Sequence, residues 1–370
     1  MKNTRGWPWI FYSPAFLVLW SAPPKQNNLT LGKGTMLLIT DEHIESLKKF
    51  ISAHETFIIA GHKEPDGDCI SCSIGMSFIL RHLGKRCTLL NIGPFKRTES
   101  RPFESYFKTD LSSVTKSERA TSGLIMVDCS EYSRIGDIGD ELKGMDTFIV
   151  DHHRTASVSG NQHIIDPTAP AAACIVLQIF EKIVGKPSKD EAHVLFFGMA
   201  TDTGFFHYLN ENDSEVFRSA ARLTDAGVNP REIYQEMSGG KPWTTRKLLS
   251  ILLERAQRYC NGKLVVTYEE QADTRKYGQE GRDSDALYSL MLATEGVEAV
   301  LFMRQESDRT CTAGFRSLRD CDVSAIASKF GGGGHKNAAG ASMEGQIDIL
   351  LPHIVREFEK VLNRDGGDVF

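Results

Sequence analysis

The sequence predicts an α/β protein: a parallel β-sheet with helices on both faces, then a smaller α/β C-terminal domain, with an active-site cleft between the two. Short, continuously apolar runs alternate with helical segments from residue 56 onward, a pattern typical of a parallel sheet buried on both faces. A length of 370 residues exceeds what one ordinary core fills and favours two domains. The Gly- and Pro-containing stretch at 238–245 indicates the break between them.

The first domain begins with an amphipathic helix that Thr40 or Asp41 caps. The runs expected to form strands are 56–61, 86–92, 123–128 and 147–151, and the expected helices are 73–83, 171–185, 189–200, 213–226 and 230–237. Parallel strands place their carboxyl ends at one edge of the sheet, where ligands bind. Polar residues follow several of these runs, so we expect them to meet at that edge.

The second domain is predicted to follow a helix at about 244–259. The expected strands are 263–268, 298–304 and 310–316, followed by a helix at 322–330, a glycine-rich tract at 331–340 and a closing helix at 346–362. We therefore divide the chain into residues 1–35 as an N-terminal extension, 36–240 as the first domain, 241–262 as a linker helix, and 263–370 as the second domain.

Residues 1–35 are set apart from this fold. Their apolar stretch at 7–22 is interrupted by Pro8 and Pro14 and has no clean cleavage site, so an export signal is the less favoured alternative. The stretch is also too short to span a membrane. Met36 opens the first recognisable helix, and we expect 1–35 to be an extension from a mis-assigned start.

Composition favours a cytoplasmic protein with no membrane segment. The 8 cysteines are scattered through apolar runs, as reduced thiols usually are. Cys69 and Cys72 form a C-x-x-C, for which a redox pair or half a zinc site is an alternative to plain packing. A net charge of -5 gives no global attraction to a long nucleic acid and favours a small phosphate ligand met by a local basic site.

Carboxylates and imidazoles recur at the ends of buried runs, where charge is costly unless it is paired or binds metal. Such ligands suit manganese, magnesium, iron or zinc, and an excess of oxygen favours the harder ions. Two metals that share one carboxylate need roughly six protein ligands. The sequence offers His62, Asp66, Asp68, Asp128, His152 and Asp202. His153 is then left for catalysis, and each motif alone could be a helix cap or a solvated turn.

The sequence Asp202-Thr203-Gly204 also suggests an aspartic protease. That chemistry needs two such carboxylates sharing a proton, and a second copy is missing from the sequence.

The glycine-rich tract predicts a phosphate site. Its consecutive glycines let the backbone approach a ligand and point amide hydrogens at it. Arg316, His335 and Lys336 add positive charge beside them. A flexible linker is the alternative, although linkers seldom lie between an amphipathic helix and a short apolar strand.

Five motifs follow one another along the chain: G-H-K-E-P-D-G-D, V-D-C-S, V-D-H-H, T-D-T-G and G-G-G-G-H-K-N-A-A-G. In this order they resemble the DHH phosphoesterase superfamily with its DHH-associated C-terminal domain. The similarity runs from about residue 40 to 362. The two-domain size resembles the bifunctional oligoribonuclease and PAP phosphatase group, or nanoRNases. Cys69 and Cys72 depart from the family, since they stand where alanine or serine is common.

The resemblance implies two manganese ions, with Mg²⁺ or Co²⁺ as substitutes. It assigns His62 and Asp66 to one ion, Asp68, His152 and Asp202 to the other, and Asp128 to both. His153 would contact the scissile phosphate or protonate the leaving group, and Asp151 would orient a ligand histidine. A terminal phosphate would be held by Arg316, Gly332, Gly333, Gly334 and His335.

The expected activity is hydrolysis of short single-stranded oligoribonucleotides to mononucleotides and of 3'-phosphoadenosine 5'-phosphate (PAP). Linear or cyclic dinucleotides are an alternative substrate class that the same residues serve, and a non-catalytic nucleotide-binding protein is an alternative of another kind. Pyrophosphatase or exopolyphosphatase activity is less favoured because of the nucleotide-handling tract. A homodimer is left open.

Overall fold

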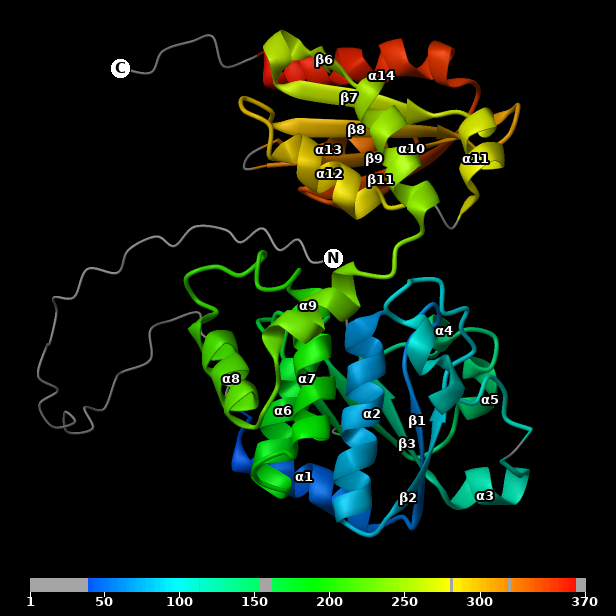
Figure 1. Cartoon of the computed structure of the whole chain (residues 1–370). Helices are drawn as coiled ribbons and strands as arrows, with labels where there is room; N and C mark the ends of the chain where they lie inside the picture. The colour runs from blue at the N-terminus through cyan, green and yellow to red at the C-terminus, as the bar shows by residue number, and fades with distance from the viewer. Residues whose placement is uncertain (1–38, 113, 154–161, 280–281, 319–320, 364–370) are drawn as a thin grey trace, which may run out of the picture.

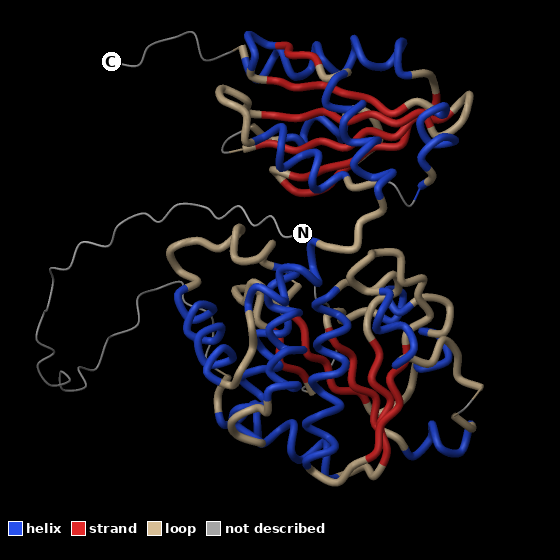
Figure 2. The backbone as a smooth tube through the Cα atoms, in the orientation of Figure 1, coloured by secondary structure: helices blue, strands red, loops and turns tan. Residues whose placement is uncertain are grey.

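In the computed structural model, the described residues are 39–112, 114–153, 162–279, 282–318 and 321–363, and they form two sheet-containing units (Figure 1). The extension at 1–35 lies outside the described residues. The two sheets have five and six strands, drawn in red in Figure 2. Residues 239–242 connect the last helix of the first unit to the first helix of the second (Figure 1).

The first sheet is parallel throughout, in the order β2-β1-β3-β4-β5. Its strands are β1 (Thr56–Ala60), β2 (Arg86–Leu90), β3 (Gly123–Val127), β4 (Thr147–Asp151) and β5 (His163–Ile165). The four strands expected from the sequence are confirmed. The edge strand β5 was not predicted, because three residues carry no usable hydrophobic pattern.

Helices cover both faces of this sheet, as predicted. One face packs with α1 (Asp41–Ser52), α2 (Gly67–His82), α6 (Ala172–Ile183) and α7 (Lys189–Asp202) in a single apolar cluster. The other face packs with the short helices α4 (Tyr132–Ile135) and α5 (Gly139–Leu142). Adjacent strand residues alternate between the two clusters, with Ile59 in the first and Ile58 in the second, because side chains of a strand point to opposite faces. The remaining helices of this unit are α3 (Lys116–Thr121), α8 (Ser214–Asp225) and α9 (Pro230–Ser238).

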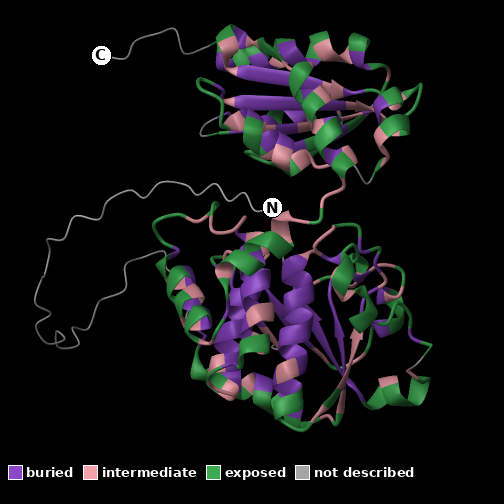
Figure 3. Ribbon diagram, in the orientation of Figure 1, coloured by how far each residue is buried: buried purple, intermediate pink, exposed green. Residues whose placement is uncertain are grey.

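Helix α2 is buried almost all round (Figure 3) and packs against α7. A Cβ on Gly67 would lie 2.4 Å from Thr201 Oγ1, and a Cβ on Gly198 would lie 2.4 Å from Ser71 Cβ. Glycine at these positions therefore permits the approach. As a result, the start of α2 lies beside the end of α7, where Asp202 is the last helical residue.

The second sheet is mixed, in the order β10-β11-β9-β8-β7-β6, and only the β7–β8 pair is parallel. Its strands are β6 (Gln257–Tyr259), β7 (Leu264–Glu269), β8 (Ala299–Gln305), β9 (Thr310–Ser317), β10 (Gly333–His335) and β11 (Ala338–Glu344). One face packs with α13 (Val323–Ser328) and α14 (Ile347–Leu362), and the other with α10 (Trp243–Glu254) and α12 (Ser284–Leu292).

Three features of the second domain differ from the expectation. The helix predicted to reach 259 ends at Glu254, and its last part is the edge strand β6. Helices α11 (Gln271–Tyr277) and α12 were not predicted. The glycine tract is part of a β10–β11 hairpin, because its neighbour β11 pairs with β9 and offers β10 an edge.

Within the described part of the chain, we find no helix with the length and apolar character needed to cross a membrane. The 8 cysteines are all free thiols.

Candidate metal centre

Neighbouring strands of the first sheet end beside one another in polar residues. His62 follows β1, Asp128 follows β3, and His152 follows β4. Strands β1 and β3 are neighbours although β2 separates them in the chain, and open α/β sheets bind ligands at such a switch point. The Asp128 carboxylate lies between two imidazoles, with Oδ2 3.4 Å from His62 Nε2 and Oδ1 3.4 Å from His152 Nε2. The expected meeting of these strand ends is therefore found in the structure.

The loop that carries His62 is fixed by the end of strand β2. Asn91 donates from Nδ2 to the His62 carbonyl at 2.9 Å, and its Oδ1 accepts from the Gly93 amide at 2.9 Å. Asp66 then caps α2 by accepting from the Cys69 amide at 3.1 Å. The same carboxylate lies 3.7 Å from His62 Nε2. One aspartate thus begins the helix and faces the site.

Asp68 is completely buried and is held by the start of a different helix. Its two oxygens accept from the amides of Ala172 at 2.6 Å and Ala173 at 2.8 Å. These are among the first amides of α6, whose N-terminus has no side-chain cap. A carboxylate is stabilised there by unpaired amides and the helix dipole.

His152 joins Asp68 to the end of α7. Its Nε2 lies 3.6 Å from Asp202 Oδ2 and 4.0 Å from Asp68 Oδ2, while its Nδ1 lies 3.0 Å from the Ala169 carbonyl. Ligand atoms of these residues gather in three overlapping groups, each within 4.8 Å: His62, Cys69 and Asp128; Asp128, His152 and His153; and Asp68, His152 and Asp202. Asp128 and His152 each belong to two groups, so the set forms one continuous cluster.

The electrostatics of the cluster favour a cation. Burial, together with the carboxylates of Asp128 and Asp202, raises the pKa of Asp68 well above its usual range. Burial likewise raises the pKa of Asp202 to about 6. Burial opposes the charge on His152, but the carboxylates of Asp128 and Asp68 outweigh it and raise that pKa to about 10. The raised pKa values of Asp68 and His152 therefore reflect an excess of negative charge that a metal ion would balance.

An orphaned atom also fits a metal. Asp128 Oδ1 is buried and makes no hydrogen bond within the described residues. It faces His152 Nε2 at 3.4 Å, and a shorter bond to a metal ion would satisfy it. Oxygen and imidazole nitrogen donors around it suit divalent ions such as manganese or magnesium. The residues present therefore fit the metals that the sequence suggests.

The expected role of Asp151 needs a correction. We expected it to orient a metal-ligating histidine, yet its Oδ1 lies 2.8 Å from Nδ1 of His153, the histidine reserved for catalysis. The same oxygen accepts from the backbone amides of His152 at 2.8 Å and His153 at 3.2 Å. The His152 ring is oriented instead by the Ala169 carbonyl, because the turn after β4 carries adjacent side chains in different directions.

A hollow of about 100 Å³ opens beside His153. Its lining includes Asp151, Glu131 and Arg134, and Arg134 is a basic residue that no sequence motif indicated. The Arg134 carbonyl also accepts from the Lys63 amide at 2.7 Å, which ties α4 to the His62 loop. The sequence around Arg134 does not indicate that this residue lies near His153, because its placement depends on the contact between α4 and the His62 loop.

The predicted phosphate-binding residues lie together in the second domain. Arg316 and His335 pair with Ala338 from its two sides, and directly opposed residues project from the same face of a sheet. The Arg316 guanidinium lies over the Tyr288 ring, 4.6 Å from its centroid, and the His335 side chain is exposed. Gly332, Gly333 and Gly334 lie at the start of β10. Gly334 has φ 147°, where a Cβ would be 2.5 Å from the Ala338 carbonyl oxygen.

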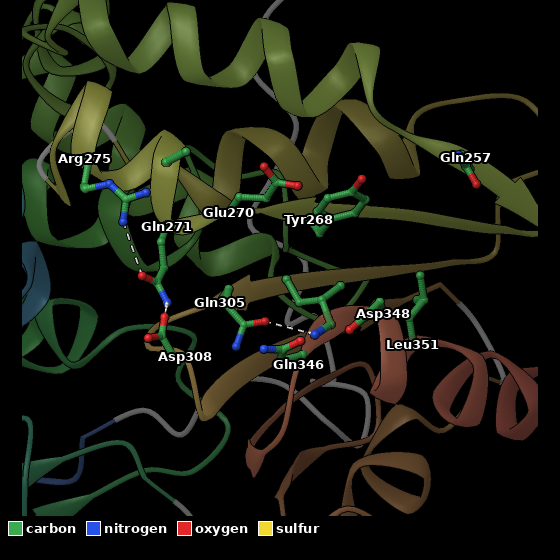
Figure 4. Close-up of a pocket in the computed structure, with 12 residues that line it drawn as sticks. Gln257, Tyr268, Glu270, Gln271, Arg275, Gln305, Asp308, Gln346, Asp348 and Leu351 are labelled. Carbon is green, nitrogen blue, oxygen red and sulfur yellow. Dashed lines mark hydrogen bonds between the residues drawn. The ribbon is translucent and has the colours of Figure 1, made fainter.

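Another hollow, of about 620 Å³, lies between α11 and the start of α14 (Figure 4). Its polar side chains largely bond one another: Gln271 donates to Asp308 at 3.0 Å, and Gln305 accepts from the Ile347 amide at 3.0 Å. Gln305 is at the opposite end of the β8–β9 pair from Arg316. This hollow therefore does not include the predicted phosphate-binding residues.

Four ring-bearing residues, at positions 205–208, follow shortly after Asp202. Phe205 and Phe206 pack against the first apolar cluster, with backbone φ values of 54° and 70°. His207 and Tyr208 are exposed. Core packing therefore accounts for the two phenylalanines.

Two known domain families match segments of this chain. Residues 56–199 match the DHH family, N-terminal domain, and residues 249–364 match the DHHA1 domain. The first match contains the strand-end residues of the cluster, and the second contains Arg316 and the glycine tract.

Similar proteins span both matches. The bifunctional oligoribonuclease and PAP phosphatase NrnA of Thermus thermophilus is 29% identical over 309 residues, which are 83% of this chain and 90% of that protein. The crystal structure of an exopolyphosphatase-related protein from Bacteroides fragilis aligns with a TM-score of 0.77 at 19% identity, over 88% of this chain and 99% of that one. The exonuclease RecJ bound to manganese aligns with a TM-score of 0.50 at 16% identity, over 89% and 96%. At these identities, the structural likenesses concern the fold.

Proposed function

This chain belongs to the DHH family of metal-dependent phosphoesterases and carries a DHHA1 domain, and we propose that it hydrolyses short oligoribonucleotides to mononucleotides and dephosphorylates PAP. The observation that carries the proposal is the Asp128 carboxylate, which lies 3.4 Å from both His62 and His152 at the switch point of the sheet. The substrate class is supported by the Thermus thermophilus relative, whose name gives both activities.

The proposed ligands fall into two sets that share Asp128: His62 and Asp66 in one, and Asp68, His152 and Asp202 in the other. We propose Mn²⁺ for both positions, with Mg²⁺ or Co²⁺ as substitutes, because carboxylate and imidazole donors suit these ions. When bound, a pair of such ions lowers the pKa of a shared water and stabilises the charge that develops on the phosphate.

We propose that His153 acts on the substrate and that Asp151 positions it. The 2.8 Å contact with Asp151 occupies Nδ1 of the ring and turns Nε2 toward other partners. In this orientation Nε2 can contact the scissile phosphate or give a proton to the leaving oxygen. The Asp151 carboxylate also stabilises the protonated ring, as an aspartate beside a catalytic histidine does. Arg134, across the neighbouring hollow, is placed to neutralise a phosphate oxygen.

The second domain is proposed to hold the far end of the substrate. Arg316 and His335 share a face of the sheet two strands apart, a separation of roughly 10 Å. Together with the amides of the glycine tract, they would bind a terminal phosphate. We retain 36–240, 241–262 and 263–370 as the proposed division of the chain. A cleft between its two main parts would exclude long chains, and this cleft stays a prediction.

The test is a substrate panel given to the purified full-length chain with manganese. It contains PAP, a labelled dinucleotide, a pentanucleotide, a chain of about two dozen nucleotides and a cyclic dinucleotide, and the initial rates are compared. We expect fast release of mononucleotides from the two shortest oligonucleotides, dephosphorylation of PAP, and slow cleavage of the long chain.

Each other outcome would point elsewhere. Equal or faster cleavage of the long chain would refute the preference for short substrates. Preferred cleavage of the cyclic dinucleotide would replace the proposed substrate with the dinucleotide class. Binding of these ligands without any hydrolysis would identify a nucleotide-binding protein instead of an enzyme.

A further inference from the structure

A cysteine thiol faces the first of the two proposed ion positions. Cys69 lies in the first turn of α2, directly after Asp68, and its side chain is completely buried. Its Sγ lies 3.9 Å from the His62 carbonyl oxygen. The ligand atoms of His62, Cys69 and Asp128 all lie within 4.8 Å of one another. The sulfur therefore lies within reach of an ion that His62 and Asp128 hold.

The neighbouring backbone leaves space for this sulfur. A Cβ on Gly61 would lie 2.2 Å from Cys69 Sγ, a distance at which one of the two atoms must move. Glycine at 61 thus accommodates a thiol at 69 immediately before the ligand His62. The second observation that points to a ligand is the Asp128 carboxylate, which is 2% exposed and reaches this position through Oδ2, 3.4 Å from His62 Nε2.

We propose that Cys69 is an additional ligand of the ion held by His62, Asp66 and Asp128, so that this position prefers a thiophilic ion such as Zn²⁺, Co²⁺ or Fe²⁺. The thiol would lose its proton to solvent when the metal–sulfur bond forms. This inference rests on the proposed metal centre and adds a ligand to it.

The two ion positions then differ in chemistry. The second set, Asp68, His152 and Asp202, has only oxygen and imidazole donors, which suit Mn²⁺. A thiolate in the first set favours softer ions. The position beside His62 and Cys69 would therefore bind Zn²⁺ or Fe²⁺ more tightly than the Mn²⁺ proposed for it above, whereas the position beside Asp202 would keep its preference for Mn²⁺.

A second buried cysteine near the centre, Cys72, provides a matched control. Cys72 lies one helical turn after Cys69, and its thiol donates to Asp68 Oδ1 at 3.5 Å. It is just as buried, but it is absent from the three ligand groups found within the described residues. Replacing Cys72 with alanine removes a thiol of equal burial from the same helix without removing the proposed ligand.

The experiment is a Co²⁺ titration of the metal-free, full-length chain followed by absorption spectroscopy, which requires no substrate. We expect d–d bands together with a sulfur-to-cobalt charge-transfer band in the near ultraviolet. Cys69→Ala should lose the charge-transfer band and keep d–d bands, whereas Cys72→Ala should keep both. In competition with a chelator, Cys69→Ala should also lose Zn²⁺ affinity by about tenfold or more, with Mn²⁺ affinity nearly unchanged.

The outcomes separate this proposal from the function on which it rests. Bands of d–d type without charge transfer in the native chain, or a charge-transfer band that persists in Cys69→Ala, would reject Cys69 and leave the metal centre intact. Failure to bind Co²⁺ at all would contradict the metal centre itself. If Cys69→Ala does not fold, X-ray absorption spectroscopy of the zinc-loaded native chain decides the question. The spectrum should show a sulfur neighbour at about 2.3 Å from zinc, and a coordination shell of nitrogen and oxygen alone would overturn the proposal.

Discussion

The hydrogen bonds of Asp151 predict a large stability effect for a nearly isosteric change. Its buried Oδ1 accepts from the amides of His152 and His153 and from the His153 ring, at 2.8, 3.2 and 2.8 Å. A bond to a charged acceptor contributes about 1 kcal/mol more than one to a neutral acceptor. Asp151→Asn should therefore lose about 3 kcal/mol over three bonds. The new amide would replace Oδ2, which already has no partner among the described residues, so this side of the group loses no further bond.

Asp146→Asn is the matched control, because Asp146 directly precedes β4 and Asp151 ends it. Its side chain is 44% exposed and lies 3.5 Å from His54 Nε2, and such surface pairs contribute little. The measurement is urea unfolding of the metal-free proteins at neutral pH, with hydrogen exchange of peptides from β3 and β4 to locate the transition. For Asp146→Asn, the free energy of unfolding should change by no more than about 0.5 kcal/mol. A similarly small change for Asp151→Asn would refute the reasoning.

The pH dependence of the Asp151 effect has a defined sign. Burial opposes its charge, but the contacts with His153 outweigh burial and lower the pKa of Asp151 from 3.8. A carboxylate with a lowered pKa contributes stability above its unfolded pKa and loses it as the pH falls through its folded pKa. The difference in unfolding free energy between the native protein and Asp151→Asn should therefore become smaller below about pH 3.8.

Further predictions concern the glycine tract, the terminal phosphate and the protonation of the centre. Gly334→Ala places a Cβ at a residue with φ 147° beside a carbonyl oxygen, and it should destabilise the second domain by about 1–3 kcal/mol in thermal unfolding. Gly333 has open space around it, so Gly333→Ala should leave the stability unchanged. Equal effects of the two substitutions would contradict the hairpin geometry. Arg316→Ala should raise KM for PAP about tenfold or more with kcat nearly constant, because a uniform binding contact is lost; a fall in kcat alone would exclude the phosphate role. The metal-free protein should lose stability as the pH rises from 6.5 to about 10, because folded His152 keeps its proton up to a raised pKa. For the same reason, Mn²⁺ binding at neutral pH should release protons, which calorimetry in buffers of different ionisation enthalpy measures. Binding without proton release would argue against His152 as a ligand.

Much of this arrangement follows from local sequence patterns. Apolar runs that end in His62, Asp128 and Asp151 identify strands by their length and composition, and parallel strands share a carboxyl edge. The fold and the gathering of the strand-end residues could therefore be predicted without coordinates. The amphipathic helices were found for the same reason, since their periodicity lies within a short window.

The features that were missed depend on contacts between distant segments. The amides of Ala172 and Ala173 bind Asp68 across a sequence separation of more than 100 residues, and no local pattern announces that contact. Strand β10 forms because β11 offers it an edge, which overrides the loop tendency of glycine. The preference of Asp151 for His153 over His152 depends on side-chain directions in one turn. Tertiary geometry, more than composition, decides each of these cases.

The central claim is that the Asp128 carboxylate joins two ion positions that together hydrolyse a phosphoester. Asp128 has φ 54°, a conformation that asparagine tolerates, so Asp128→Asn keeps the backbone and removes the charge. The decisive measurement is the rate of PAP and dinucleotide hydrolysis at saturating Mn²⁺, with bound metal counted in the same samples. We expect a fall of at least about a hundredfold, since such ions contribute several kcal/mol to the barrier, and fewer than two ions bound per chain. Native rates in Asp128→Asn would contradict the account.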